Sequence, residues 1–196
     1  NVLFVHDHKL RKVGNEFYTT GGFSDSVTNR YTDIFGKMVL LCRASENNNI
    51  LGCEKISNDK LRVCPIYTNK MLPNKKILGI LNKEIEKSDK VIVRLPSILG
   101  LYASKIAFKK NKTLMVEVVG SAFGSYWYKG LIGKVLAYPL ELVNKIIIKK
   151  ADYVLYVSED YLQKAYINKN IYYSILYSSP DTLFWEREHK KNQKRR

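Results

Sequence analysis

The sequence predicts an α/β fold built on a doubly wound, mainly parallel sheet of six or seven strands with helices on both faces. Short runs that are apolar throughout recur along the chain, and this pattern is typical of strands covered on both sides. Segments with apolar residues at helical spacing separate these runs. The chain has 196 residues, of which 45% are hydrophobic, so it can bury one full core.

Each expected strand is a short apolar run bounded by polar residues. The first is Val2 to Val5, and we expect a loop to lead from it to Gly21. Pro65 lies in the third run and places that strand near an edge of the sheet or near its own end, because proline cannot donate a ladder hydrogen bond. The polar run 44–49 is expected to form a loop or hairpin. The strands are expected at residues 2–5, 38–43, 61–67, 90–96, 113–120, 151–158 and 172–177.

Helices are expected between these strands. Ser97 can cap the helix that follows the fourth strand, and Pro139, which lacks an N–H, should kink or split the longest helix. The domain is expected to span residues 1–180, and the basic segment 181–196 is expected to be a tail or the start of a linker. The helices are expected at residues 24–35, 74–88, 97–109 and about 129–150, with a short one from Glu159.

The charge of the chain restricts its partners. Lysine and arginine number 33 against 18 acidic residues, which gives a formal net charge of +15 and favours anionic ligands, anionic lipid or nucleic acid. Cys42, Cys53 and Cys64 are odd in number and have no histidine at metal-ligand spacing, so they indicate free thiols. The sequence shows no leader pattern and no membrane-spanning apolar run, and we expect a cytoplasmic protein that can still lie on a membrane.

Gly21 and Gly22 precede an expected helix. Two glycines let backbone N–H groups approach a ligand where a side chain would collide, and Ser24 or Asp25 can cap the helix. The free N–H groups and the dipole of a helix start would suit a diphosphate. An ordinary tight turn explains the same residues, and the carboxylate of Asp25 would repel a diphosphate. We expect bulky residues at either glycine to abolish ligand use and to leave thermal stability nearly unchanged.

Polar residues at the carboxyl ends of the expected strands are the candidate site, because ligands of such sheets bind there. Arg94 and Glu117 lie at similar heights, and they are either a buried ion pair or groups that bind a phosphorylated or hydroxylated ligand. A histidine among these residues can act as acid or base, although loop histidines are often only solvated. The candidates are His6, Asp7, His8, Arg94, Ser97, Glu117, Gly120, Ser121, Ser158 and Glu159.

Several signatures of nucleotide chemistry are absent from the sequence. No Gly-x-Gly-x-x-Gly follows the first strand, and no Gly-x-x-x-x-Gly-Lys-[Ser/Thr] occurs, which argues against a dinucleotide-binding domain and a P-loop enzyme. There is no Gly-x-Ser-x-Gly elbow and no Asp-x-Asp pair that would hold a metal-bound nucleotide sugar. We therefore expect no metal and no cofactor.

The order of the motifs resembles the N-terminal domain of family 4 glycosyltransferases, above all those that build capsular and other cell-surface polysaccharides. The resemblance covers roughly residues 1–180. It rests on Val2-Leu-Phe-Val-His-Asp-His, Gly21-Gly-Phe-Ser-Asp-Ser-Val with Arg30-Tyr and Ile34-Phe, Arg94-Leu-Pro-Ser, Val116-Glu-Val-Val-Gly, and Ala151-Asp-Tyr-Val-Leu-Tyr-Val-Ser-Glu.

This resemblance implies one half of a GT-B fold, in which two Rossmann-like domains face each other across a cleft. The N-terminal domain receives the acceptor, which would be a saccharide or a lipid-linked oligosaccharide precursor. The C-terminal domain binds the nucleotide sugar, whose diphosphate would meet Gly21 and Gly22. The acceptor-side residues would be Asp7, Arg94, Ser97, Gly120, Ser121, Ser158 and Glu159.

The sequence departs from this family at two places. Many relatives have a histidine before the glycine that closes the fifth strand, and this chain has Val119 there, so Glu117 or His6 would be the catalytic residue, or orientation alone would suffice. The acidic and basic residues of the donor domain would lie beyond Arg196. We therefore expect a glycosyltransferase of hexosyltransferase type whose residues 1–196 transfer no sugar alone.

Two other classes remain open at this point. The chain could be a non-catalytic subunit that pairs with a separate catalytic chain. A basic nucleic-acid-binding protein is a weaker alternative, because no recognition helix or aromatic RNA-binding strand is present. We expect no nucleic-acid partner.

The helix expected at 129–150 suggests an anionic membrane as a partner. A helical wheel places most of its apolar residues on one broad side and Lys134, Glu141, Asn144 and Lys145 on the other. Packing of the apolar side on the sheet explains this pattern as well. The neighbouring aromatic residues and the surplus of lysines favour lipid and a peripheral location at the inner face of the membrane. The residues expected to face the membrane are Trp127, Lys129, Lys134 and Lys145.

Overall fold

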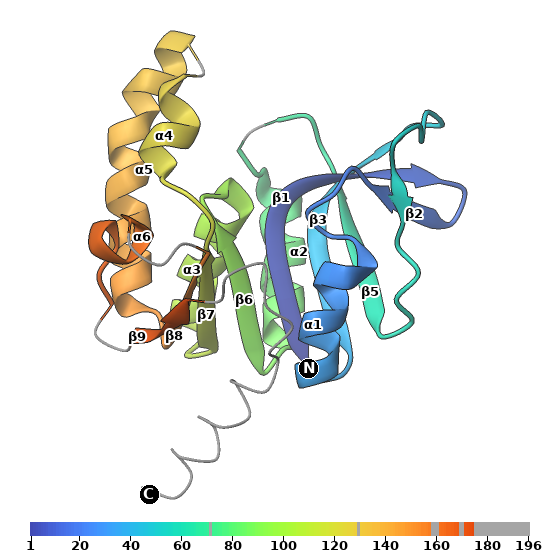
Figure 1. Cartoon of the computed structure of the whole chain (residues 1–196), viewed down its shortest axis with the longest axis horizontal. Helices are drawn as coiled ribbons and strands as arrows, with labels where there is room; N and C mark the ends of the chain where they lie inside the picture. Colours follow the sequence, from blue (N-terminus) through green and yellow to red (C-terminus); the bar gives the residue numbers. More distant parts are fainter. Residues whose placement is uncertain (71, 129, 158–160, 169–170, 175–196) are drawn as a thin grey trace, which may run out of the picture.

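The computed structural model describes residues 1–70, 72–128, 130–157, 161–168 and 171–174 and contains a nine-stranded sheet flanked by helices (Figure 1). The mainly parallel, Rossmann-like α/β fold that the sequence predicts is thereby confirmed. The strands are β1 (Val2–Val13), β2 (Glu16–Thr19), β3 (Met38–Glu46), β4 (Glu54–Lys55), β5 (Leu61–Tyr67), β6 (Lys90–Leu95), β7 (Thr113–Val118), β8 (Tyr153–Tyr156) and β9 (Ile171–Ser174). The helices are α1 (Asp25–Phe35), α2 (Lys75–Glu86), α3 (Ile98–Lys109), α4 (Ala122–Trp127), α5 (Gly130–Lys150) and α6 (Tyr161–Ala165).

The parallel strands lie in the spatial order β5-β3-β1-β6-β7-β8-β9. The chain starts at β1, adds β3 and β5 on one side, and then crosses to β6 and continues outward on the other side. The strand order therefore reverses between β1 and β6. In doubly wound sheets the carboxyl ends of the strands at such a switch point form the ligand-binding position.

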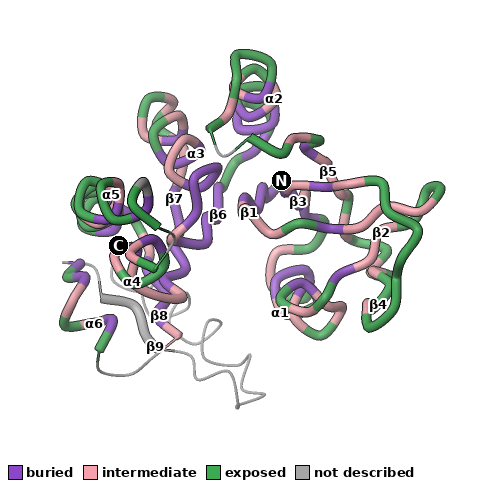
Figure 2. The backbone as a smooth tube through the Cα atoms, turned by 90° about the horizontal axis from the view of Figure 1, so that it is seen from above, coloured by how far each residue is buried: buried purple, intermediate pink, exposed green. Residues whose placement is uncertain are grey.

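Alternate residues of the strands face two different core clusters. Leu3 and Val5 of β1 pack with apolar residues of α2, α3 and α5 on one face of the sheet. Phe4 packs on the other face with Phe23 and with Tyr31 of α1. Burial is concentrated in the central strands and on the inner sides of the helices (Figure 2). The sheet is thus covered on both faces, which explains why its central strands are apolar throughout.

The expectation of a short first strand followed by a loop is wrong. β1 continues to Val13, turns at Gly14, and pairs antiparallel with β2, which in turn pairs with β4. Charged residues fill the second half of β1 because this part of the strand leaves the covered sheet, so the apolar pattern stops at Val5. The Gly-Asn pair at residues 14 and 15 is a hairpin signal that could have revealed the turn.

Two other boundaries differ from the expectation. β3 extends to Glu46, so the first half of the segment expected to be a loop at 44–49 continues to pair with β1. Helix α5 is continuous from 130 to 150 with Pro139 inside it, and it is not split. The separate helix α4 precedes it and was not expected, because its apolar and aromatic residues show no long helical period.

Capping of α2 and α3 follows the sequence pattern, whereas capping of α1 does not. The side chain of Asn74 accepts a hydrogen bond from Ile77 N, and that of Ser97 accepts one from Gly100 N. Ser24 occupies the cap position of α1, but its side chain makes no capping hydrogen bond. Polar side chains satisfy free N–H groups at the two capped helix starts.

Some sequence-based expectations fall outside the described residues. These are Ser158 and Glu159, Lys129, and the tail at 181–196. Within the described ranges, no helix is both long enough and apolar enough to cross a membrane.

Leu3 at the centre of β1 should be far more sensitive to truncation than an exposed leucine. Leu3 is fully buried, whereas Leu51 is 89% exposed. We expect Leu3→Ala to lower the free energy of unfolding by about 2 to 5 kcal/mol, because it removes buried methyl groups and leaves a cavity. The matched Leu51→Ala variant should change it by less than about 0.5 kcal/mol. Urea denaturation followed by circular dichroism measures both, and equal losses would contradict the described core.

Candidate functional site

A bulge in β1 creates the site at the switch point. β1 pairs with β6 only from Val2 to Val5, and its register with β3 shifts between Val5 and Lys9. Three residues of β1, His6, Asp7 and His8, lie opposite the single residue of β3 between Leu41 and Arg43. Bulges redirect side chains and are common next to functional sites. The bulge accordingly moves these three side chains out of the ladder where β1 and β6 separate.

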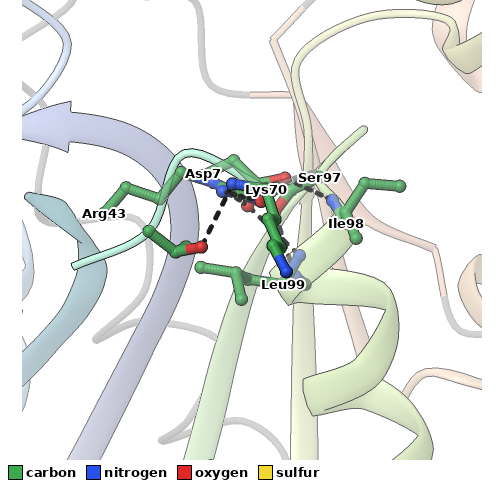
Figure 3. Close-up of polar contacts among 8 residues, drawn as sticks. Asp7, Arg43, Lys70, Ser97, Ile98 and Leu99 are labelled. Carbon is green, nitrogen blue, oxygen red and sulfur yellow. Dashed lines mark hydrogen bonds and ion pairs between the residues drawn. The ribbon is translucent and has the colours of Figure 1, made fainter. Parts of the chain in front are cut away.

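Asp7 occupies the start of helix α3. Its carboxylate accepts hydrogen bonds from the backbone N–H of Ile98 and, at 3.3 Å, from that of Leu99. Arg43 Nε donates to the same carboxylate at 3.1 Å (Figure 3). A carboxylate is favourable at the positive end of a helix dipole. The anion position of α3 is therefore already filled by a side chain of the protein, with Ser97 as the second cap.

Arg94 and Glu117 form a buried, bidentate ion pair between β6 and β7. Arg94 Nε and Nη2 donate to the two carboxylate oxygens of Glu117 at 2.8 and 3.1 Å. The two residues are only 5% and 2% exposed. The hydroxyl of Tyr31 on α1 donates to Glu117 at 2.9 Å. These contacts favour the ion-pair interpretation, because both groups are largely engaged inside the protein.

The same arginine holds the glycine loop. Arg94 Nη1 donates to the carbonyl of Gly22 at 3.1 Å, and the centre of its guanidinium lies 4.5 Å from the ring centroid of Phe23. Phe23 is buried and anchors the loop to the core. Arg94 thus connects the loop that follows β2 with the ion pair between β6 and β7.

Both glycines of the loop adopt backbone conformations that favour a residue without a side chain. Their φ angles are +107° at Gly21 and +74° at Gly22, a region that strains other residues. A Cβ added at Gly21 would meet no atom within 4 Å, and Gly120 at the end of β7 is equally open. The space beside these backbones is available to a ligand. The expectation that bulky residues would leave thermal stability unchanged is wrong, because any side chain is strained at these φ angles.

A short relay next to the loop fixes the tautomer of His8. The hydroxyl of Thr19 donates to the carbonyl of Gly21, and the same hydroxyl oxygen lies 2.8 Å from His8 Nε2. Since this hydroxyl has one proton, His8 Nε2 must carry the hydrogen that joins the two groups. Nδ1 of the neutral ring then carries no hydrogen and can act as an acceptor, and it lies beside Gly22, where an added Cβ would be 3.7 Å away.

His6 lies deeper than His8 in the same bulge. Burial, followed by the charges of Arg94 and His8, lowers its pKa to about 3. Burial and the charge of Arg94 also lower the pKa of His8. Within the described part of the chain, no group hydrogen-bonds Nδ1 of His6, which is buried. Both imidazoles are therefore neutral near pH 7, and His6, with a pKa of about 3, is a poor proton acceptor there.

Ser121 and Glu141 organise the region beyond β7. The hydroxyl of Ser121 accepts a hydrogen bond from Gly124 N and caps α4. Glu141 of α5 accepts hydrogen bonds from Phe123 N at 3.0 Å and from the hydroxyl of Tyr166 at 2.7 Å. This carboxylate fastens α5 to the start of α4.

Asp25 does not face the glycine loop. Its carboxylate accepts hydrogen bonds from the backbone N–H groups of Ser57 and Asn58 at 3.0 to 3.2 Å. The objection that Asp25 would repel a diphosphate loses force, because the carboxylate is engaged with the segment before β5.

The structure therefore brings most of the predicted residues to one end of the sheet. Gly22, Arg94 and Glu117 are joined by direct contacts, and Asp7 and Ser97 meet at α3, which directly follows β6. The positions of Ser158 and Glu159 lie outside the described residues. Sequence reasoning missed four residues that hold the site together, because their contacts join distant segments and no local motif marks them. These are Thr19, Tyr31, Arg43 and Glu141.

Comparisons with known proteins give one relative. The chain matches no protein-family model. It is 39% identical over 171 residues to "Protein CapJ" of Staphylococcus aureus, in an alignment that covers 84% of this chain and 44% of CapJ. The chain therefore spans less than half the length of this relative.

Removing one partner of the Arg94–Glu117 ion pair should destabilise the protein more than replacing both residues together. Glu117→Gln leaves the charge of Arg94 buried with a neutral partner, and we expect it to lower the free energy of unfolding by about 3 to 5 kcal/mol. The double variant Arg94→Met/Glu117→Met should be more stable than Glu117→Gln, because it removes both buried charges. Urea denaturation of the variants measures their free energies of unfolding. If the double variant loses as much stability as the two single-site losses added together, the two residues are not coupled.

His6 should make stability depend on pH. Its pKa is about 3 in the folded protein against an ordinary value of 6.5, so the unfolded chain binds more protons between these values. Stability is then complete above pH 6.5 and is lost as the pH falls toward 3. Between pH 7 and pH 5 we expect His6 to account for a loss of about 2 kcal/mol.

The variant His6→Gln tests this contribution. Its unfolding free energy, measured in urea at pH 7 and at pH 5, should fall by about 2 kcal/mol less than that of the parent chain over the same interval. His8→Gln, which alters the less deeply buried ring, should give a smaller difference. Identical pH dependence in the parent chain and His6→Gln would show that His6 titrates normally.

Proposed function

We propose that this chain is the acceptor-side half of a GT-B glycosyltransferase that acts in the assembly of a capsular or related cell-surface polysaccharide. The observation that carries this proposal is the open glycine loop, which Arg94 holds over the carboxyl ends of the strands at the switch point. The motif order described above supports the enzyme class. The name of the relative CapJ, together with 39% identity, supports the capsule.

The glycine loop would bind the donor diphosphate. Gly21 and Gly22 leave the backbone accessible, and helix α1 begins three residues after Gly22 with a positive dipole end and a cap residue, Ser24, whose side chain makes no capping hydrogen bond. Such a site stabilises the charge that develops on a leaving nucleoside diphosphate. Arg94 would contribute by positioning the loop, with Glu117 and Tyr31 holding the arginine.

The acceptor hydroxyl would meet the bulge of β1. His8 would replace there the histidine that Val119 does not supply, since its ring is neutral and its Nδ1 lies beside Gly22, whereas Nδ1 of His6 is buried. Gly120 and Ser121 would border the acceptor, because the backbone at Gly120 is open. Glu117 lies too deep to touch an acceptor without movement of Arg94, and its contribution to catalysis would be indirect.

The donor sugar needs a second domain, which the remainder of a longer chain or another subunit would supply. CapJ is more than twice as long as the aligned segment, which leaves room for such a domain in that relative. Bringing donor and acceptor to within about 3 to 3.5 Å of each other is where much of the rate of such a transfer arises. Residues 1–196 alone would bind acceptor and transfer nothing.

Binding by residues 1–196 tests this assignment. We expect isothermal titration calorimetry to detect a soluble analogue of a lipid-diphosphate-linked saccharide and to show no heat above background with uridine or guanosine diphosphate sugars. The uncharged saccharide without its diphosphate is the control ligand. Tight binding of a nucleotide sugar, or its turnover by this chain, would contradict an acceptor-side half.

Gly22→Ala separates the ligand role of the loop from its role as a turn. Gly36 has a φ angle of +76° against +74° at Gly22, and an added Cβ meets nothing within 4 Å there, so Gly36→Ala is a matched control. Each substitution should cost about 1 to 2 kcal/mol of stability, because both force a side chain into the left-handed region.

Only Gly22→Ala should impair function. In the chain extended by its donor domain, we expect this variant to lower kcat/KM for the nucleotide sugar by at least about tenfold, while Gly36→Ala leaves it within about twofold. Equal kinetic effects of the two variants would mean that the glycine loop is an ordinary turn.

A further inference from the structure

Helix α5 exposes a continuous apolar stripe. Its residues recur at intervals of three or four, which places them on one side of the helix. The first and the last of these residues are 15 positions apart, so the stripe extends for about 22 Å. Monomeric proteins rarely leave such a contiguous apolar surface uncovered. The stripe consists of Leu131 (82% exposed), Val135 (74%), Tyr138 (66%), Leu142 (61%) and Ile146 (46%).

The buried side of α5 carries Ile147 and Ile148 toward the end of the helix and smaller or polar residues before them. Gly133 and Ala137 are buried, as is Asn144, which the helical wheel had placed on the outer side with Glu141. Glu141 points toward α4 and accepts its hydrogen bonds there. The wheel prediction was therefore wrong about which polar residues face outward. From residue 133 to residue 146 the buried positions that the structure describes are Gly133, Ala137 and Asn144, and the large apolar residues of the stripe remain outside.

Helices α4 and α5 rise side by side above the carboxyl ends of the strands (Figure 1). Aromatic rings gather where they pack together. The rings of Phe123 and Trp127 stack with centroids 4.8 Å apart, and Tyr138 contacts both. Tyr128 beside them is 87% exposed. Tryptophan and tyrosine at the tip of a projecting structure are suited to the headgroup level of a bilayer.

Positive charge surrounds the stripe. Lys134 lies over the ring of Trp127, with Nζ 5.4 Å from its centroid, and Lys149 and Lys150 are exposed at the other end of α5. Lys145 is exposed as well, although its Nζ also lies 3.7 Å from Glu141. Glu141 is the one acidic residue of the helix, and it faces inward.

From this arrangement we infer that the exposed face of α5 docks on an anionic lipid surface, with the stripe buried at the boundary between headgroups and acyl chains. Lysines on both flanks would meet lipid phosphates, whereas a second copy of the chain would bring these like charges together. Trp127, Lys134 and Lys145, predicted to face the membrane, flank or precede the stripe. The inference does not depend on sugar transfer by the protein.

Trp127 can report the docking directly. The chain has two tryptophans, and Trp185→Phe leaves Trp127 as the only one. We expect its fluorescence to shift to shorter wavelength with vesicles of phosphatidylglycerol and phosphatidylcholine, and brominated acyl chains should quench it. Vesicles of phosphatidylcholine alone should have a much weaker effect, and increased salt should release the protein from the anionic vesicles.

Matched variants locate the binding face in a vesicle co-sedimentation assay. Val135→Ser/Leu142→Ser should weaken binding by at least about tenfold, whereas Leu51→Ser/Leu72→Ser, at exposed leucines on other loops, should leave it unchanged. Each lysine near an anionic surface strengthens binding about fivefold, so Lys134→Glu/Lys149→Glu should weaken it by at least about twentyfold. Lys75→Glu/Lys83→Glu on α2 alters the net charge equally and should have much less effect.

Three results would overturn the inference. The first is no binding to anionic vesicles or equal binding to neutral ones. The second is equal weakening by the stripe variants and their controls. The third is concentration-dependent self-association, measured by sedimentation velocity without lipid, that the stripe variants abolish, since the stripe would then be an interface between two copies. Thermal melting of each variant shows that it remains folded.

Discussion

The contact of Arg94 with Glu117 and Gly22 is the constraint on which the arrangement of the site depends. The guanidinium joins three segments that are far apart in sequence: the loop before α1, the end of β6 and the end of β7. The ring of Phe23 covers the face of the same guanidinium, whose N–H groups make their hydrogen bonds in the plane of the group. A glycine loop has little preferred conformation of its own. Its position here follows from an arginine that β6 holds in the core.

The fold could be predicted from the sequence where local pattern decides it. All seven parallel strands overlap predicted apolar runs such as Val2 to Val5, and the caps Asn74 and Ser97 mark helix starts. The hairpin β1–β2 was missed because its charged residues lie outside the covered sheet. The orientation of α5 was predicted incorrectly for a different reason. Hydrophobicity alone does not distinguish a helix face that packs in the core from one that binds a partner. Small residues such as Gly133 and Ala137 allow α5 to pack closely on its neighbours.

Most residues of the candidate site could also be named in advance, but their roles could not. Asp7 was expected to contact an acceptor, and the structure shows its carboxylate on the N–H groups of α3. A protein side chain at that helix start leaves the start of α1, where Ser24 makes no capping hydrogen bond, as the position proposed for an external anion. Similarly, Asp25 is turned toward Ser57 and Asn58. Such assignments depend on which distant segments meet, and local spacing does not contain this information.

The site and the proposed lipid surface are connected through one short helix. Ser121, which follows the open backbone of Gly120, caps α4, and the aromatic residues at the other end of α4 border the stripe of α5. Six residues of helix span about 9 Å, so a membrane along α5 would lie close to the carboxyl ends of the strands. Glu141 of α5 joins the two helices by accepting a hydrogen bond from Phe123 N at the start of α4. Under the proposed function, a saccharide linked through a diphosphate to a lipid would then reach this end of the sheet without leaving the bilayer.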